Sequence, residues 1–255
     1  ADFQVTALDR GGHSSLPRPD NAIYELTNAL NRLAHYSFPF ELNEVTRAYF
    51  KNLARQETGQ TAMDMRAILA TPPDLTAAVR LSAEPSFNSN FRTTCVATRL
   101  SGGHANNALP QTAQANVNCR IFPGHSPEEI RQQLIALFDD SKLSVKYVSD
   151  AGVVSDTAPD RKAIAPPAPI KAVFDPLTRI TQQIWPATPV TPVMENGASD
   201  SIYFAQAGIP SYGYSAIALE RDDDRAHGQD ERLPVDSYWK ALDFFYSFTK
   251  ALGSE

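Results

Sequence analysis

The sequence has few cysteines, no long apolar run and no excess of positive charge. Its two cysteines, Cys95 and Cys119, occur in no Cys-x-x-Cys pair, which argues against a zinc ribbon or a disulfide framework. Because no run of 18 apolar residues occurs, we expect no membrane span. The net charge of −6 argues against nucleic-acid binding, since such proteins gather Lys and Arg on one face. The 255 residues, 42% of them hydrophobic, are typical of one large or two modest globular domains.

Two features leave the cellular compartment open. Cys95 and Cys119 each lie in a β-like run, which favours buried small apolar side chains over a disulfide, although the sequence does not decide whether they pair. The N-terminus has no basic region followed by an apolar stretch, so no signal peptide is visible. The sequence therefore does not distinguish a cytoplasmic from a periplasmic or secreted protein.

The first part of the chain, residues 1–150, alternates between strand-like and helix-like segments. Strands are expected at 1–8, 92–103, 112–122 and 143–150, and helices at 20–36 and 126–140. Asp20 is the expected N-cap of the first helix, and Ser126 with Glu129 forms a capping box for the second. A helical insertion at about 40–90 interrupts the order. The remaining order predicts a ferredoxin-like βαββαβ domain.

The second part, residues 151–255, begins with a linker-like stretch rich in Pro and Ala. Helices are expected at 174–185, 199–208 and 235–253, and short strands at 189–194 and 209–219. Asp236 is the expected N-cap of the last helix, which ends at Gly253. The alternation predicts an α/β fold, the C-terminal portion of a doubly wound domain.

Polar residues that could take part in binding or catalysis occur in both parts. His227 lies in the acidic loop DDDRAHGQDERLP, where neighbouring carboxylates suit a zinc ligand, yet the alternative is a solvated loop with an incidental histidine. Arg120 lies in a β-like run, where it either faces solvent or clamps a carboxylate. Asn107 could donate to an oxyanion, although asparagine is also common in turns.

A strand-to-helix turn contains Gly197, Ala198 and Ser199. Small residues there let backbone N–H groups approach an anion, whereas the alternative is a plain turn with Ser199 or Asp200 as an N-cap. Adjacent Glu128 and Glu129 are not expected to be an acid–base pair, because the capping box and the helix dipole explain both.

The other histidines differ in how well they qualify as candidate functional residues. His13, in GGHSSLPRPDNAI, would fit a simple turn if it stood alone. His104 repeats the Gly-Gly-His pattern and is a second-rank candidate. His35 ends an apolar stripe and His125 adjoins a helix cap, so structural roles are expected for both.

Four stretches, taken in order, resemble one family. They are GGHSSLPRPDNAI, GGHANNALPQTAQANVNCRIFPG, ENGASDSIYFAQAGIPSYG and AHGQDERLPVD. Each is weak alone, but in this order they resemble the dinuclear zinc amidohydrolases and exopeptidases that include carboxypeptidase G, aminoacylase and succinyl-diaminopimelate desuccinylase. The resemblance implies a catalytic α/β domain with two zinc ions and an inserted ferredoxin-like lid that forms a homodimer. Residues 1–150 would be the lid, and residues 151–255 the end of the catalytic domain.

The resemblance also implies roles for individual residues. His13 matches a lid histidine that stabilises the oxyanion of the tetrahedral intermediate in the partner subunit's site, and Asn107 matches the asparagine that assists it. Arg120 matches the arginine that grips the substrate's carboxylate. Gly197, Ala198 and Ser199 match a substrate-binding loop, and His227 matches the C-terminal zinc ligand.

One departure from the family pattern is large. The other zinc ligands and the general base come from a His-x-Asp motif, a bridging Asp and a Glu-Glu pair upstream of the lid, and this sequence has no such His-x-Asp. We therefore expect the C-terminal part of a longer zinc hydrolase, without its N-terminal catalytic segment. That enzyme would cleave an amide or peptide bond beside a free carboxylate, as in an N-acyl amino acid or peptide. Alone, this part should be inactive and bind zinc weakly or not at all.

The alternative from another class is a non-catalytic dimerisation or binding module built on the ferredoxin-like domain. It explains the missing ligands, but it does not explain why His227, Arg120 and the Gly-Ala-Ser turn occur together. The substrate's side chain is not specified by the sequence.

Overall fold

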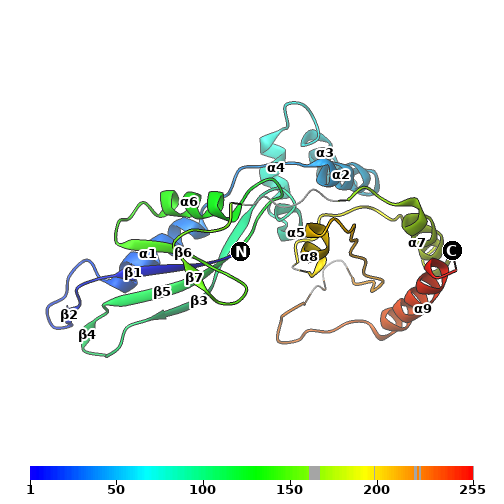
Figure 1. Cartoon of the computed structure of the whole chain (residues 1–255). Coiled ribbons are helices and arrows are strands. Elements are labelled where there is room, and N and C mark those ends of the chain that lie inside the picture. Colours follow the sequence, from blue (N-terminus) through cyan, green and yellow to red (C-terminus); the bar gives the residue numbers. More distant parts are fainter. Residues whose placement is uncertain (161–166, 198, 221–222, 224, 255) are drawn as a thin grey trace. The chain divides into compact units, whose positions relative to one another are not determined.

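A computed structural model describes residues 1–160, 167–197, 199–220, 223 and 225–254 (Figure 1). The chain divides into two compact units, Ala1–Ala165 and Pro166–Glu255. Within the described residues, no helix is both long enough and apolar enough to cross a membrane.

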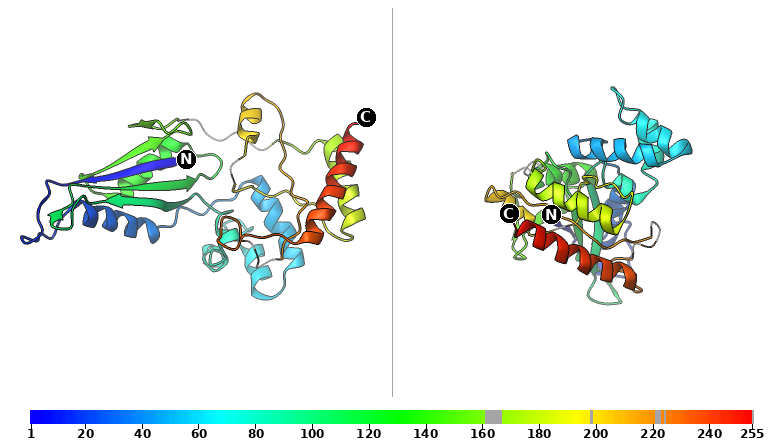
Figure 2. Two further views of the ribbon diagram at one scale, coloured as in Figure 1. Left: turned by 90° about the horizontal axis from the view of Figure 1, so that it is seen from below. Right: turned by 90° about the vertical axis from the view of Figure 1, so that its right-hand side faces the viewer.

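The first unit is built on a five-stranded antiparallel sheet. Its order is β3 (Thr94–Gly102), β5 (Thr112–Arg120), β1 (Asp2–Leu8), β6 (Leu143–Val148) and β7 (Val154–Ser155). Helices α1 (Ala22–Ala34) and α6 (Pro127–Phe138) pack together and against the strands (Figures 1 and 2). The order β3-β5-β1-β6 is the split βαβ arrangement expected from the sequence, and it leaves β3 at an edge.

The core lies between the sheet and the two helices. Alternate residues of the strands and one stripe of each helix are buried, as the periods of 2 and 3.6 require. The buried side chains include Phe3, Val5, Ala7, Leu26, Leu33, Ala115, Val117, Ile130, Leu134 and Phe138. The opposite face of the sheet carries polar residues such as Gln4, Thr6, Asn116 and Asn118.

The helix caps correct one expectation and confirm another. Asn21, not Asp20, caps α1: its side chain accepts hydrogen bonds from the backbone N–H groups of Ile23 and Tyr24 at 3.0 and 3.1 Å. Asp20 instead binds Arg18 and Lys142. The capping box of Ser126 and Glu129 at the start of α6 is present.

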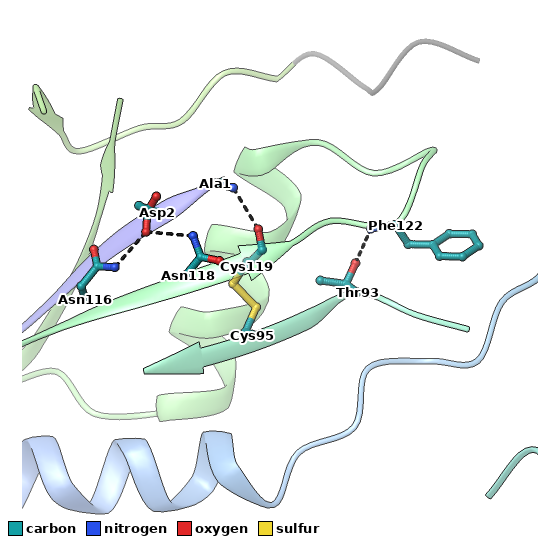
Figure 3. The surroundings of a disulfide bond; sticks show 8 residues. All are labelled: Ala1, Asp2, Thr93, Cys95, Asn116, Asn118, Cys119 and Phe122. Atoms are coloured by element: carbon teal, nitrogen blue, oxygen red, sulfur yellow. Dashed lines mark hydrogen bonds between the residues drawn. A yellow bond between two sulfur atoms is a disulfide. The ribbon is translucent and has the colours of Figure 1, made fainter. Parts of the chain in front are cut away.

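The two cysteines form a disulfide, which corrects the expectation of two separate apolar side chains (Figure 3). Cys95 of β3 lies directly opposite Cys119 of β5 in the ladder, with the Cα atoms 4.1 Å apart. The sequence shows a β-like run around each cysteine but not the register of the two strands. The register is what brings the sulfur atoms together.

The insertion is a helical subdomain with its own small core. It contains α2 (Glu44–Gln56), α3 (Gly59–Ala67), α4 (Leu75–Leu81) and α5 (Pro85–Asn88). In its centre Phe50 stacks on Phe91 and meets Phe87 edge to face, and Met65 and Ile68 are fully buried beside them. The short helices expected between 40 and 90 are therefore formed.

The second unit contains α7 (Lys171–Ile184), α8 (Ser201–Gln206) and α9 (Val235–Leu252). The strands expected at 189–194 and 209–219 are not formed, because a strand needs a hydrogen-bonding neighbour and none is present among the described residues of this unit. Val190, Tyr214 and Ile217 nevertheless pack against the core that α7 and α9 share.

The last helix also begins differently from the expectation. Pro234 is the N-cap of α9, and no side chain caps the helix there. Asp236 lies inside the first turn, where its negative charge interacts favourably with the positive end of the helix dipole.

Candidate functional site

His13 and Asn107 lie together at one end of the sheet. The short strand β2 (Gly12–His13) pairs with β4 (Ala108–Leu109), so that His13 is opposite Ala108 (Figure 1). The backbone N–H of Ser14 donates to the Asn107 carbonyl at 3.0 Å. Two residues far apart in the sequence are thus joined on one ribbon, and both are exposed.

Arg18 holds the loop that carries His13. Its Nη1 donates to the Gly11 carbonyl at 2.9 Å, its Nη2 pairs with Asp9, and its Nε donates to Asp20 at 3.3 Å. The side chain of Asp9 is only 5% exposed, and it also accepts from the Gly11 N–H at 2.8 Å. One guanidinium therefore ties Asp9, Gly11 and Asp20 together, a role that was not expected from the sequence.

Gly11 lets its loop approach Gln111 closely. Its φ of +73° lies in the left-handed region, and a Cβ there would lie 2.6 Å from Cγ of Gln111. Any other residue would be strained and would push the two loops apart.

The imidazole of His13 is contacted by Ser15. His13 Nδ1 lies 3.2 Å from the Ser15 backbone nitrogen and 2.8 Å from Ser15 Oγ. A role for Ser15 was not expected from the sequence, although its spacing of two residues from His13 is that of a local side-chain-to-backbone turn.

Arg120 lies at the other end of the sheet. It ends β5 opposite Thr94 and is exposed. Beside it, Asp2 accepts from the side-chain amides of Asn116 and Asn118 at 2.8 and 3.1 Å (Figure 3). Burial alone would raise the pKa of Asp2, but these hydrogen bonds, together with the positive charges of the N-terminus and Arg120, lower the pKa below its ordinary value.

One chain therefore does not bring all its candidate residues into one cluster. β5 spans nine residues, so Thr112 and Arg120 at its two ends lie about 26 Å apart at the usual rise of a strand. His13 and Asn107 lie beyond the Thr112 end (Figure 1).

In the second unit, His227 is exposed and has a φ of 63°. Two described carboxylates of its loop bind arginines: Asp223 pairs with Arg225 and Arg232, and Asp230 pairs with Arg225. The hydrogen bond from Arg225 holds the pKa of Asp223 below its ordinary value. Asp223 and Asp230 therefore pair with arginine side chains rather than with the imidazole of His227.

The described residues do not make a complete metal site. They contain no group of three or more His, Cys, Asp or Glu side chains that could hold an ion. His227 alone cannot satisfy zinc, which takes three or four protein ligands. A dinuclear zinc centre does not fit this part of the chain by itself.

The turn before α8 is partly described. The Gly197 N–H donates to Glu195 Oε1 at 2.9 Å, and the Ser201 N–H donates to Ser199 Oγ at 3.3 Å. Asp200 occupies the N-cap position without a side-chain bond. Ala198 lies outside the described residues.

The remaining histidines have different surroundings. His125 lies between Glu41 and Glu129, with Nε2 2.7 Å from Glu41 Oε1 and Nδ1 3.2 Å from Glu129 Oε2. Burial opposes protonation, but the two carboxylates raise the pKa of His125. His35 Nδ1 donates to the Asn31 carbonyl at 2.8 Å. His104 is exposed between β3 and β4.

Glu128 corrects the expectation that the helix cap explains both glutamates. Only Glu129 belongs to the capping box, whereas Glu128 accepts from Arg131, Gln132 and the Ala158 N–H. The hydrogen bond from Arg131 is the largest cause that lowers the pKa of Glu128 to about 2. Glu128 anchors the segment after β7 to α6.

Comparison with known proteins relates both units to one group. Residues 1–146 match the model of the peptidase dimerisation domain. The chain is 26% identical over 254 residues to the probable carboxypeptidase S-like 2 of Dictyostelium discoideum, covering 98% of this chain and 46% of that protein. It is 25% identical over 239 residues to the human N-fatty-acyl-amino acid synthase/hydrolase PM20D1, covering 92% of this chain and 45% of that protein.

A solved structure extends the likeness to the fold. The M20 family metallo-carboxypeptidase Sso-CP2 from Sulfolobus solfataricus matches with a TM-score of 0.56 and 15% identity, over 98% of this chain and 58% of that chain. The chain spans about half the length of the curated relatives it matches. With a dimerisation domain over more than half of its length, the chain belongs to the M20 peptidase family.

Proposed function

We propose that this chain is part of a hydrolase that cleaves an amide or peptide bond beside a free carboxylate, and that each active site combines residues of two subunits. The observation that carries the proposal is the separation of His13 and Asn107 from Arg120 by the length of β5. A human relative named as a hydrolase of N-fatty-acyl-amino acids supports an N-acyl amino acid or peptide as the substrate class.

The separation is too long for one small substrate. The carbonyl oxygen and the carboxylate of an N-acyl amino acid lie within a few ångströms of each other, whereas the two ends of β5 are about 26 Å apart. The side chains of His13 and Arg120 together do not span that gap. If both residues contact one substrate, they must come from different copies.

The edge of the sheet offers a way to bring them together. β3 is an edge strand, and its side chains Val96 and Leu100 are 60% and 71% exposed. Antiparallel pairing of β3 with β3 of a second copy would cover them through a twofold interface. The end of β3 at Thr94, next to Arg120, would then lie beside the partner subunit's end at Gly102, which leads to its Asn107 and His13.

The chemistry divides between the two copies. The planar guanidinium of Arg120 suits a bidentate contact with the substrate's carboxylate. His13 and Asn107 of the partner subunit donate hydrogen bonds to the carbonyl oxygen as negative charge develops on it. One such donor typically contributes about 3–4 kcal/mol to the transition state. Residues 1–150 thus act as the dimerising lid.

The second unit contributes the remaining candidate residues. We propose that residues 151–255 are the C-terminal portion of a doubly wound catalytic domain, with Gly197, Ala198 and Ser199 in the substrate-binding loop. His227 would be one ligand of a two-zinc centre, with the other ligands and the general base in a segment outside these residues. The 255-residue chain alone is then inactive and binds zinc weakly or not at all. When bound, the metal activates water.

Substitution of Arg120 tests the assigned role in the whole protein. Arg120→Gln should raise KM about 10–100-fold for an N-acyl amino acid, because a charged hydrogen-bonded contact is lost. KM for the corresponding amide, which lacks the carboxylate, should change little. Steady-state kinetics with both substrates measures the difference.

The matched control is Arg55→Gln, at an exposed arginine in the last turn of α2. It should leave both KM values at those of the wild type. An equal rise of KM for acid and amide in Arg120→Gln, or no rise at all, would contradict the carboxylate clamp.

A further inference from the structure

The contact between Ser15 and His13 specifies which ring nitrogen carries the proton. A backbone N–H can only donate, so the Ser15 N–H at 3.2 Å requires a lone pair on His13 Nδ1. Ser15 Oγ, 2.8 Å from the same nitrogen, can donate to it as well. The neutral ring then carries its proton on Nε2.

We propose that Ser15 is a positioning residue that presents His13 as an Nε2–H donor. The inference rests on the proposed function, in which His13 donates to the developing oxyanion. An imidazole with its proton on Nδ1 would turn a lone pair toward negative charge and repel it. Fixing the tautomer before the reaction removes that unproductive form.

The loop is built to keep this geometry. Arg18 binds Asp9, Gly11 and Asp20, so both ends of the loop are held by one side chain. The pairing of β2 with β4 fixes the backbone of His13 itself. The backbone that carries Ser15 is therefore held on both sides. The contact with Ser15 then has to fix only the side-chain torsions of His13.

The same chain contains an opposite case. His35 also has a serine two residues later, Ser37, yet its Nδ1 contacts the Asn31 carbonyl at 2.8 Å. A carbonyl only accepts, so neutral His35 carries its proton on Nδ1. The sequence spacing alone does not set the tautomer; the loop geometry does.

Nitrogen NMR on the 255-residue chain, with 15N-labelled histidine and serine at a pH where imidazoles are neutral, tests the inference. We expect an unprotonated Nδ1 for His13 and a scalar coupling across the hydrogen bond to the Ser15 amide nitrogen. In the same spectrum His35 should have a protonated Nδ1. A protonated Nδ1 on His13, or an even mixture of tautomers without the coupling, would overturn the inference.

Kinetics of the whole protein test whether the tautomer matters. Ser15→Ala keeps the backbone N–H but loses the hydroxyl, so kcat should fall about 2–10-fold with KM unchanged, the range of one net hydrogen bond. Ser15→Thr, which restores the hydroxyl, should recover the activity. Ser37→Ala, the matched serine beside His35, should have no effect.

The two proposals fail in different ways. An unchanged kcat in Ser15→Ala would overturn the positioning role even if the coupling is present. Full activity of His13→Ala would overturn the proposed function while leaving the tautomer of His13 as measured.

Discussion

Glu128 shows how a single residue can gain a role that its sequence context hides. It follows the N-cap Ser126 in the first turn of α6, a place where the helix dipole is explanation enough for a carboxylate. Its actual partners include the Ala158 N–H, 30 positions away, and no local pattern reveals a contact of that range. Its strongest partner, Arg131, lies three residues later in the same helix.

Glu128→Gln should therefore lower stability in a pH-dependent way. A pKa lowered from 4.5 to about 2 means that ionised Glu128 stabilises the fold above pH 4.5, and that this contribution is lost as the pH falls toward 2. Because the side chain is 22% exposed, we expect a loss of about 1–2 kcal/mol at pH 7. Urea denaturation at pH 7 and pH 3 measures it.

The control for this variant is Glu44→Gln, at an exposed glutamate that begins α2. Its stability should follow the pH dependence of the wild type. A difference between Glu128→Gln and the wild type that is as large at pH 3 as at pH 7 would refute the ionic explanation.

The cap of α1 marks the limit of residue-level prediction. Asp20 and Asn21 are adjacent, and both residue types are good N-caps. Lys142, just before β6, and Arg18 attract the charged Asp20, which leaves the cap to neutral Asn21. Choosing between them needs a contact across the fold, which a local pattern does not contain.

At the scale of elements, the first unit was predictable because each element agrees with its neighbours. The alternation in β1 and the apolar stripe of α1 indicate a sheet covered by helices on one face, and the structure has this arrangement. In the second unit the apolar runs 189–194 and 209–219 have the composition of strands. They lack partners among the described residues, and composition alone forms no ladder.

The disulfide between β3 and β5 should stabilise the sheet edge. It closes a segment with a sequence separation of 24, for which loss of chain entropy in the unfolded state predicts about 3 kcal/mol. Reductant should therefore lower the midpoint of urea denaturation of the oxidised wild type. The variant with both Cys95→Ala and Cys119→Ala should start lower and not respond to reductant.

A thiol count provides the decisive control for that prediction. The purified chain should have no titratable thiol under denaturing conditions without reductant. Two free thiols per chain, or a denaturation midpoint that reductant does not change, would contradict the cross-strand bond.

At the scale of the molecule, α9 leaves several large apolar side chains exposed. Phe244 faces α7 and is fully buried, whereas Tyr238, Trp239, Leu242, Phe245 and Tyr246 are each at least 42% exposed. A group of exposed large apolar side chains is typical of a surface that another part of a protein covers. Since the curated relatives are about twice as long, this exposed face supports a catalytic domain completed outside these residues.

The central claim is that His13 and Asn107 of one subunit serve the site that contains Arg120 of the other. Two variants of the whole protein, His13→Ala and Arg120→Gln, are mixed under conditions that exchange subunits and assayed at a substrate concentration well below the wild-type KM, where each variant alone has little activity. A mixed dimer has one site in which all three residues are intact. With random exchange, half of the dimers are mixed, so about a quarter of the wild-type activity should return.

Mixing His13→Ala with Asn107→Ala is the matched control. These two residues lie on one ribbon of the same chain, so every site in the mixed dimer lacks one of them and no activity should return. Recovery of activity with the first pair and none with the second is the predicted result. If the first mixture stays inactive although size measurements show that the subunits have exchanged, the shared site is contradicted.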